Sequence, residues 1–89
     1  MRFYKNRLLD EETLLKIGFK HIVYDFYDYR TQYNHIRYNL RTGEIFVNEV
    51  QQYHNVYTIW EFMMTLMYNG ISDLRYEESI FKNLDYNNN

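Results

Sequence analysis

The chain has 89 residues, a mass of 11.2 kDa and a net charge of −2 at pH 7, which is the size of one small domain. It contains no cysteine, which excludes a disulfide framework and a thiolate metal site. Its isoelectric point of about 5.9 is unlike the values above ~9 that are typical of a dedicated nucleic-acid-binding domain. The two halves of the chain have opposite net charge. Residues 1–43 hold eight cations against five anions, and residues 44–89 hold two cations against seven anions.

The first expected element is a short helix that begins after Asp10, because an aspartate side chain can accept hydrogen bonds from the free backbone N–H groups of a first turn. Gly18 stands where such a helix ends, since glycine tolerates the positive φ that helix C-termini adopt. The apolar residues of this helix are Leu14, Leu15 and Ile17.

Three strands of an antiparallel sheet are expected next. They span residues 19–29, which are rich in aromatic and β-branched side chains, residues 35–40, which alternate between apolar and polar, and residues 44–50. Successive side chains of a strand point to opposite faces of the sheet. A single strand over 19–29 therefore predicts that Tyr24 faces the core and that Tyr27 faces outward.

The register of the second and third strands can be predicted from their apolar residues. A loop of two or four residues between them places Tyr38 opposite Ile45 and Ile36 opposite Val47, which keeps one apolar face. A three-residue loop would place Tyr38 opposite Phe46 and Ile36 opposite Asn48, which breaks the apolar face. We therefore expect an even-length loop.

The clearest local signal is a capping box in residues 58–61, where Thr58 can cap a helix and Glu61 can reach back to the capping residue. Apolar residues then recur with the period of a helix that is buried on one side, and Gly70 ends the pattern. These apolar residues are Ile59, Phe62, Met63, Leu66 and Met67. A three-stranded sheet needs such a helix across one face to bury enough surface.

The sequence thus predicts a single small α+β domain over residues 1–86. Its elements are a short N-terminal helix, a three-stranded antiparallel sheet, a capped amphipathic helix packed on one sheet face, and a short C-terminal helix over residues 72–84. Residues 87–89 are expected to form a frayed polar tail.

The sequence does not predict an enzyme, a metal site or a cofactor site. Three histidines, His21, His35 and His54, match no zinc-binding spacing. The two serines, Ser72 and Ser79, lie in no nucleophile motif, and three scattered glycines cannot build a phosphate loop. We therefore expect neither catalytic nor metal-binding residues.

The tyrosines are the most informative feature, because several crowd residues 24–38 together with arginines. Exposed Tyr and Arg are enriched at the hot spots of protein interfaces. A Tyr/Arg-rich sheet face can also stack the bases of single-stranded nucleic acid, and a third interpretation places these rings in a second core layer. The candidate partner-binding residues are Tyr27, Tyr29, Tyr33, Arg37, Trp60 and Met64.

The composition also bears on origin and location. The absence of Ala and Pro, with eleven Tyr and ten Asn, is the bias of AT-rich codons and suggests a phage or mobile element of a low-GC bacterium. No stretch is apolar enough to span a bilayer, and the first residues do not form a secretion signal. We therefore expect a cytoplasmic protein without a membrane partner, located in the host cytoplasm if it is phage-encoded.

The hypothesis from sequence is a small non-enzymatic binding protein that binds and modulates or inhibits a host protein, such as a defence enzyme. A homodimer is also expected, since a thin core with excess aromatic residues leaves apolar surface that a second copy can cover. The alternative is a nucleic-acid or nucleotide-binding module that uses the Tyr/Arg-rich sheet face.

Overall fold

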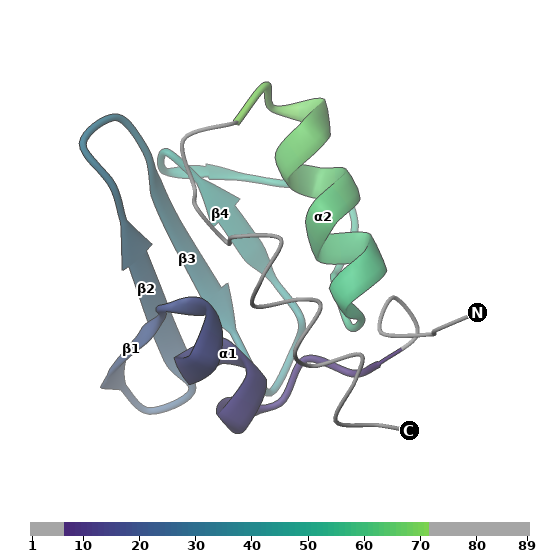
Figure 1. The fold of residues 1–89 in the computed structure, drawn as a ribbon. Coiled ribbons are helices and arrows are strands. Elements are labelled where there is room, and N and C mark those ends of the chain that lie inside the picture. The colour runs from purple at the N-terminus through teal and green to yellow at the C-terminus, as the bar shows by residue number, and fades with distance from the viewer. Residues whose placement is uncertain (1–6, 72–89) are drawn as a thin grey trace.

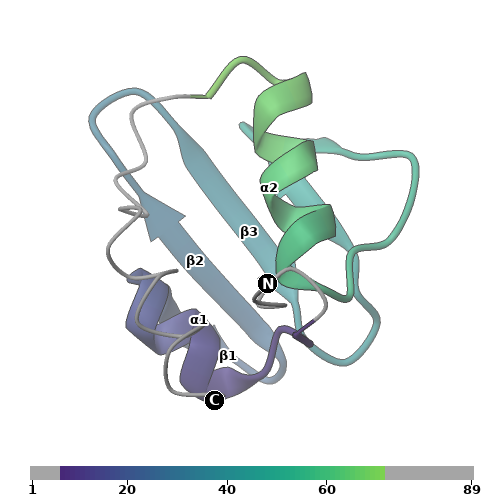
Figure 2. The same cartoon turned by 45° about the vertical axis from the view of Figure 1, so that its right-hand side comes forward.

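The computed structural model describes residues 7–71, which form two helices and a five-stranded antiparallel sheet (Figure 1). The strands lie side by side in chain order, and both helices lie on the same side of the sheet (Figures 1 and 2). The elements are α1 (Glu11–Ile17), β1 (Lys20–Val23), β2 (Phe26–Arg30), β3 (His35–Asn39), β4 (Ile45–Val47), β5 (Val50–Gln51) and α2 (Ile59–Tyr68).

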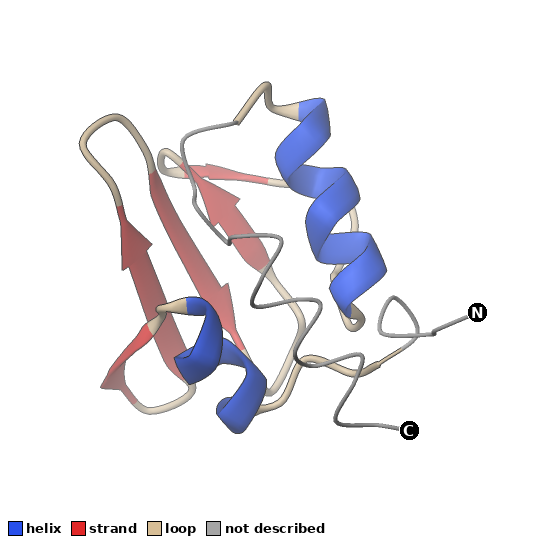
Figure 3. Cartoon of the chain, viewed as in Figure 1, coloured by secondary structure: helices blue, strands red, loops and turns tan. Residues whose placement is uncertain are grey.

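This arrangement confirms the α+β class, and Figure 3 shows the helices and the sheet as two layers. The expected number of three strands is wrong, because the sheet has five. The helix expected over 72–84, the domain limit at residue 86 and the tail 87–89 lie outside the described residues.

The ends of α1 follow the sequence. The Asp10 carboxylate accepts a hydrogen bond from the Thr13 N–H at 2.8 Å, which satisfies one free donor of the first turn. After the helix, Gly18 adopts a φ of +122° and lies against the Tyr29 ring. A Cβ at this position would come within 2.9 Å of Tyr29 Cε2, so both the backbone and the close approach require glycine.

The predicted capping box of α2 is present. Thr58 Oγ1 accepts from the Glu61 N–H at 3.1 Å, and Glu61 Oε1 accepts from the Thr58 N–H at 3.0 Å. The Tyr57 N–H also donates to Glu61 at 2.8 Å, and these backbone hydrogen bonds hold the pKa of Glu61 below its usual value. The buried side of α2 is shorter than the sequence predicts, because Met67 at its end is 67% exposed.

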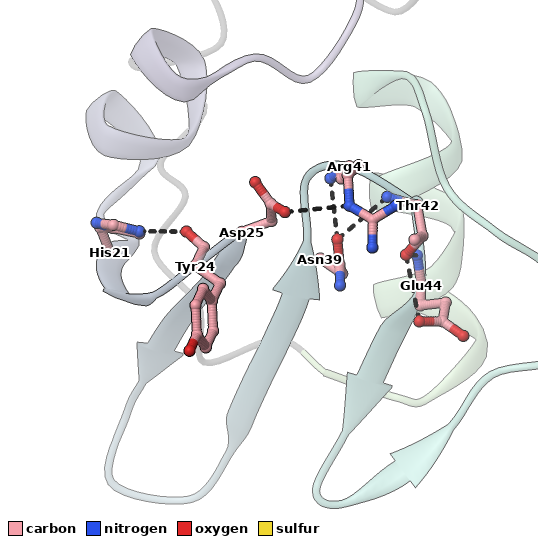
Figure 4. A network of polar contacts seen from close by, with 7 residues as sticks. All are labelled: His21, Tyr24, Asp25, Asn39, Arg41, Thr42 and Glu44. Atoms are coloured by element: carbon pink, nitrogen blue, oxygen red, sulfur yellow. Dashed lines mark hydrogen bonds and ion pairs between the residues drawn. The ribbon is translucent and has the colours of Figure 1, made fainter.

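The predicted register between β3 and β4 is confirmed, since Tyr38 pairs with Ile45 and Ile36 pairs with Val47. The connecting turn is stabilised by the Asn39 side chain at the end of β3 (Figure 4). Its carboxamide oxygen accepts from the backbone N–H groups of the two following turn residues, Arg41 at 2.9 Å and Thr42 at 3.1 Å. This local hydrogen bonding favours the turn.

The expectation of one strand over residues 19–29 is wrong. The chain reverses at Tyr24 and Asp25, which form a two-residue turn between β1 and β2, and Tyr24 has a φ of +50°. Figure 4 shows His21 Nε2 pointing at the carbonyl oxygen of Tyr24, 2.5 Å away. The turn breaks the alternation on which the prediction relied, so Tyr24 is 85% exposed and Tyr27 only 4% exposed.

The expected strand over 44–50 also divides into two. Asn48 and Glu49 both have positive φ, at 51° and 72°, and form a two-residue turn between β4 and β5. The Asn48 carboxamide oxygen accepts from the backbone N–H of His35 at 2.8 Å, and the Asn48 N–H donates to the His35 carbonyl. This turn is therefore tied to the start of β3.

The core lies between the helices and the inner face of the sheet. Tyr38 is 1% exposed, and its hydroxyl donates to the carbonyl of Val56 at 2.5 Å. Phe19 contacts both α2 and the sheet. Its ring centroid lies 5.7 Å from that of Phe62 on α2 and 5.4 Å from that of Tyr29 on β2. No element within residues 7–71 covers the outer face of the sheet.

Candidate functional site

Two surfaces of the described residues combine exposed apolar or aromatic side chains with polar groups. They lie on opposite layers of the fold, one along α2 and the other on the outer face of the sheet. The helix surface consists of Tyr53, His54, Trp60, Met64 and Tyr68. The sheet surface consists of Phe26, Asp28, Arg30, His35, Arg37, Phe46 and Glu49.

The helix surface is positioned by the capped start of α2. Trp60, Met64 and Tyr68 are spaced four residues apart and therefore follow one another along one side of the helix. Trp60 is 45% exposed and Tyr68 is 80% exposed. The helix end is tied to the preceding loop by a hydrogen bond of 3.0 Å from Asn69 Nδ2 to the side-chain oxygen of Gln52.

Two adjoining hollows lie on the helix surface. One of about 140 Å³ lies over Trp60 and Met64, and another of about 260 Å³ lies beside Tyr53. His54 and Tyr68 line both hollows, so the two are contiguous. The surface is therefore an uneven aromatic groove, and the Glu61 carboxylate of the capping box also lines it.

The centre of the sheet surface is the Asp28 carboxylate, which two neighbours on β3 contact. Arg37 Nε donates to it at 3.0 Å, and His35 Nε2 lies 2.7 Å from its other oxygen. Burial alone would raise the pKa of Asp28, but these hydrogen bonds and the positive charge beside it outweigh burial and lower the pKa. The same contact raises the pKa of the Arg37 guanidinium. Asp28 therefore holds both side chains in place.

A shallow hollow of about 400 Å³ lies over this centre, lined by Phe26, Arg30, His35, Arg37, Phe46 and Glu49. Among residues 7–71, Arg30 makes no hydrogen bond or ion pair. The strand register places Arg30 opposite His35, and Arg37 between Asp28 and Phe46. The hollow thus brings two guanidinium groups, two aromatic rings and one free carboxylate together.

The charges at the adjoining end of the sheet are already paired. Arg41 Nε lies 3.2 Å from the Asp25 carboxylate, and Glu44 accepts a hydrogen bond from the Thr42 hydroxyl at 3.2 Å (Figure 4). Because both members of the Arg41–Asp25 pair are exposed, the pair contributes little to stability.

The prediction that Tyr27 faces outward is wrong. Its ring is buried, and its hydroxyl donates to Glu11 Oε2 at 2.7 Å, which joins β2 to α1. Burial and the hydrogen bond to the Glu11 carboxylate raise the pKa of Tyr27 to about 12. Tyr29 is half-buried and packs against the same core through Phe19. Both rings therefore belong to the same core cluster as Ile36 and Tyr38, rather than to a second core layer.

The other candidate residues are exposed or partly exposed, but the structure does not gather them at one place. Tyr33 is 72% exposed in the loop between β2 and β3, and Arg37 lies on the sheet surface. Trp60 and Met64 lie together on the helix surface. The expected single Tyr-rich face is thus replaced by two separate surfaces.

Sequence reasoning missed Phe26 and Phe46 on the sheet surface and Tyr68 on the helix surface. In a single strand over 19–29, Phe26 lies on the same face as Tyr24, so the parity error that places Tyr27 outside also places Phe26 in the core. The strict alternation of β3 and β4 could have found Phe46, since Ile45 and Val47 on either side of it face the core. Tyr68 lies eight residues after Trp60, which is a helical spacing.

Residues 7–71 contain no group of three or more His, Cys, Asp or Glu side chains that could hold a metal ion. None of their helices has the length and apolar character needed to cross a membrane.

Comparisons of the chain with family models, curated proteins and solved structures find no match, so its own geometry carries the functional argument.

Proposed function

We propose that this is a non-enzymatic binding protein that acts in the host cytoplasm by binding and inhibiting or modulating a host protein through the helix surface. The observation that supports this most strongly is the row of Trp60, Met64 and Tyr68 along the outside of α2, next to two contiguous hollows. Trp and Tyr are the residues most enriched at energetic hot spots, and Met adapts to irregular partner surfaces.

Within residues 7–71, the row lies outside the cluster of buried core residues. α2 contributes Ile59, Phe62 and Leu66 to the core from its other side, and each of these is at most 1% exposed. A helix that is apolar on a second side has a surface suited to a partner. The hollows along this row give the apolar side chains of a partner a place to pack, which is how hot-spot residues usually act.

The composition supports a host target. A chain with the codon bias of a low-GC genome, of this small size and without a recognisable catalytic motif, fits a phage or mobile-element product that acts on a host protein. The choice of a defence enzyme or a replication enzyme as target is left to experiment.

The experiment is capture of a host partner with matched variants. Met64→Ala and Tyr68→Ala should each weaken the purified complex by about thirtyfold, and together by more than thirtyfold, since a hot-spot truncation costs about 2 kcal/mol. The control is Tyr33→Ala, which removes an equally exposed ring from a distant loop.

The expected result is that Tyr33→Ala binds as the wild type does and that all variants keep the wild-type melting midpoint. Equal binding by wild type and the double variant would overturn the proposal. Sedimentation of the free protein shows whether a second copy occupies the helix surface instead, in which case the same variants would dissociate a dimer.

A further inference from the structure

The sheet surface carries cations that the fold itself does not neutralise. Arg37 is engaged by Asp28, but the Arg30 side chain is free among the described residues, and Lys20 lies directly across from Asp28 on β1. Against these three cations stand two carboxylates, Asp28 and Glu49, and the charge of Glu49 also acts on Arg37. The sheet surface together with Lys20 therefore keeps an excess of one positive charge, which favours an anionic ligand, although the whole chain carries −2.

Two aromatic rings flank these cations. Phe46 is the cross-strand neighbour of Arg37, and Phe26 precedes Asp28 by two residues on β2. Strand spacing and rise place the two phenylalanines about 12 Å apart on the sheet. No other ring within the described residues stacks on either one. Both rings are partly exposed and line the hollow, where a planar ligand can contact them.

This distance distinguishes between forms of nucleic acid. Bases in a helical strand follow one another every 3.4 Å or so, so two neighbouring stacked bases cannot reach both rings. A single strand with unstacked bases can place one base on each phenylalanine and a phosphate near Arg37, which lies on β3 between the two rings, while Arg30 at the end of β2 can reach a neighbouring phosphate.

We propose that the sheet surface binds a short single-stranded nucleic acid, with Phe26 and Phe46 as stacking residues and Arg30 and Arg37 as phosphate-binding residues. This function uses the layer opposite the helix surface and does not depend on the host-protein proposal. An acidic peptide could also satisfy the arginines, but it would supply no planar groups to two separated rings.

The experiment measures the anisotropy of a labelled oligothymidylate of about 12 nucleotides, within the usual range of such sites, against the full chain at about 50 mM salt. We expect micromolar binding whose logarithm falls with the logarithm of salt concentration with a slope of about −1.4, as for two phosphate contacts. Arg30→Ala should reduce affinity and bring the slope closer to zero by about 0.7.

Phe46→Leu should weaken binding by about fivefold or more without changing the salt slope, because it removes stacking and no charge. Lys16→Ala is the matched control, since Lys16 is an exposed cation on α1, on the helix side of the fold. It should bind the oligonucleotide as the wild type does. Met64→Ala should also bind as the wild type does, because Met64 lies on the helix surface and not on the sheet surface.

Three results would overturn the proposal. They are the absence of binding at low salt, an equal loss for Lys16→Ala and Arg30→Ala, and displacement of the oligonucleotide by an oligoglutamate of the same charge at the same concentration. The last result would assign the hollow to acidic peptides. Failure of the host-protein proposal leaves all of these measurements unchanged.

Discussion

Replacement of Tyr27 by alanine tests the reversal of parity in the first hairpin. Tyr27 is 4% exposed, sits in the core and joins β2 to α1 through its hydrogen bond to Glu11. Tyr24, three residues earlier, is 85% exposed in the turn. The two tyrosines should therefore differ sharply in their effect on the free energy of unfolding.

The magnitude follows from burial. Truncation of a buried aromatic ring to alanine costs about 3–5 kcal/mol. Tyr27→Phe keeps the ring and removes only the hydroxyl, which should cost about 1 kcal/mol, since the exposed Glu11 carboxylate can turn to water. A domain of this length has a total stability of about 4–13 kcal/mol, so Tyr27→Ala should remove a large part of it.

The assay is urea unfolding followed by far-ultraviolet circular dichroism, with linear extrapolation to water. Tyr24→Ala is the control and should stay within about 0.5 kcal/mol of wild type. A continuous strand over 19–29 would make Tyr24→Ala the more destabilising change, and if Tyr24→Ala proves at least as destabilising as Tyr27→Ala, the exposed turn at Tyr24 is refuted.

Three further predictions concern the cap and titration. Thr58→Ala should cost about 1 kcal/mol and lower the melting midpoint by about 4–8 °C, and an unchanged midpoint would contradict a cap at this residue. Burial raises the pKa of Tyr27 and of Tyr38 to about 12, whereas unfolded tyrosine ionises near pH 10 or so. Stability should thus be full below about pH 10 and fall as the pH rises towards 12, and absorbance titration should show two phenols ionising late. The lowered pKa of Asp28 contributes stability above about pH 4 that is lost as the pH falls further, so Asp28→Asn should flatten the acid limb of a stability profile, and an unaltered limb would contradict this.

Local chemistry made much of the fold predictable. Asp10 and Thr58 each cap the helix that the sequence assigned to them, because capping depends on neighbours within three residues. The pairing of Tyr38 with Ile45 was predictable because one slip would have moved an entire apolar set to the wrong face.

The two-residue turns were not predictable in the same way. Tyr24 carries a positive φ that its side chain does not favour, and nothing around it in sequence marks a turn with glycine or proline. Tertiary pairing of β1 with β2 overrides the local preference. One missed turn then moved Tyr27 from the core to the surface in the prediction, and Phe26 from the surface to the core.

The candidate surfaces show the same limit. Trp60 and Met64 could be placed together from helical spacing, because both lie on one continuous element. The sheet surface depends on the register of three strands, and its central contact joins Asp28 to His35 and Arg37 across a loop. A contact between side chains of different strands can be predicted only if every turn between those strands is also predicted correctly.

The central claim is that the row of Trp60, Met64 and Tyr68 is the surface that binds a host protein. The most direct measurement is the affinity of a purified host partner for wild type, for the Met64→Ala/Tyr68→Ala double variant and for Tyr33→Ala. The account predicts a loss of more than thirtyfold for the double variant and wild-type affinity for Tyr33→Ala. Wild-type affinity of a folded double variant would contradict it.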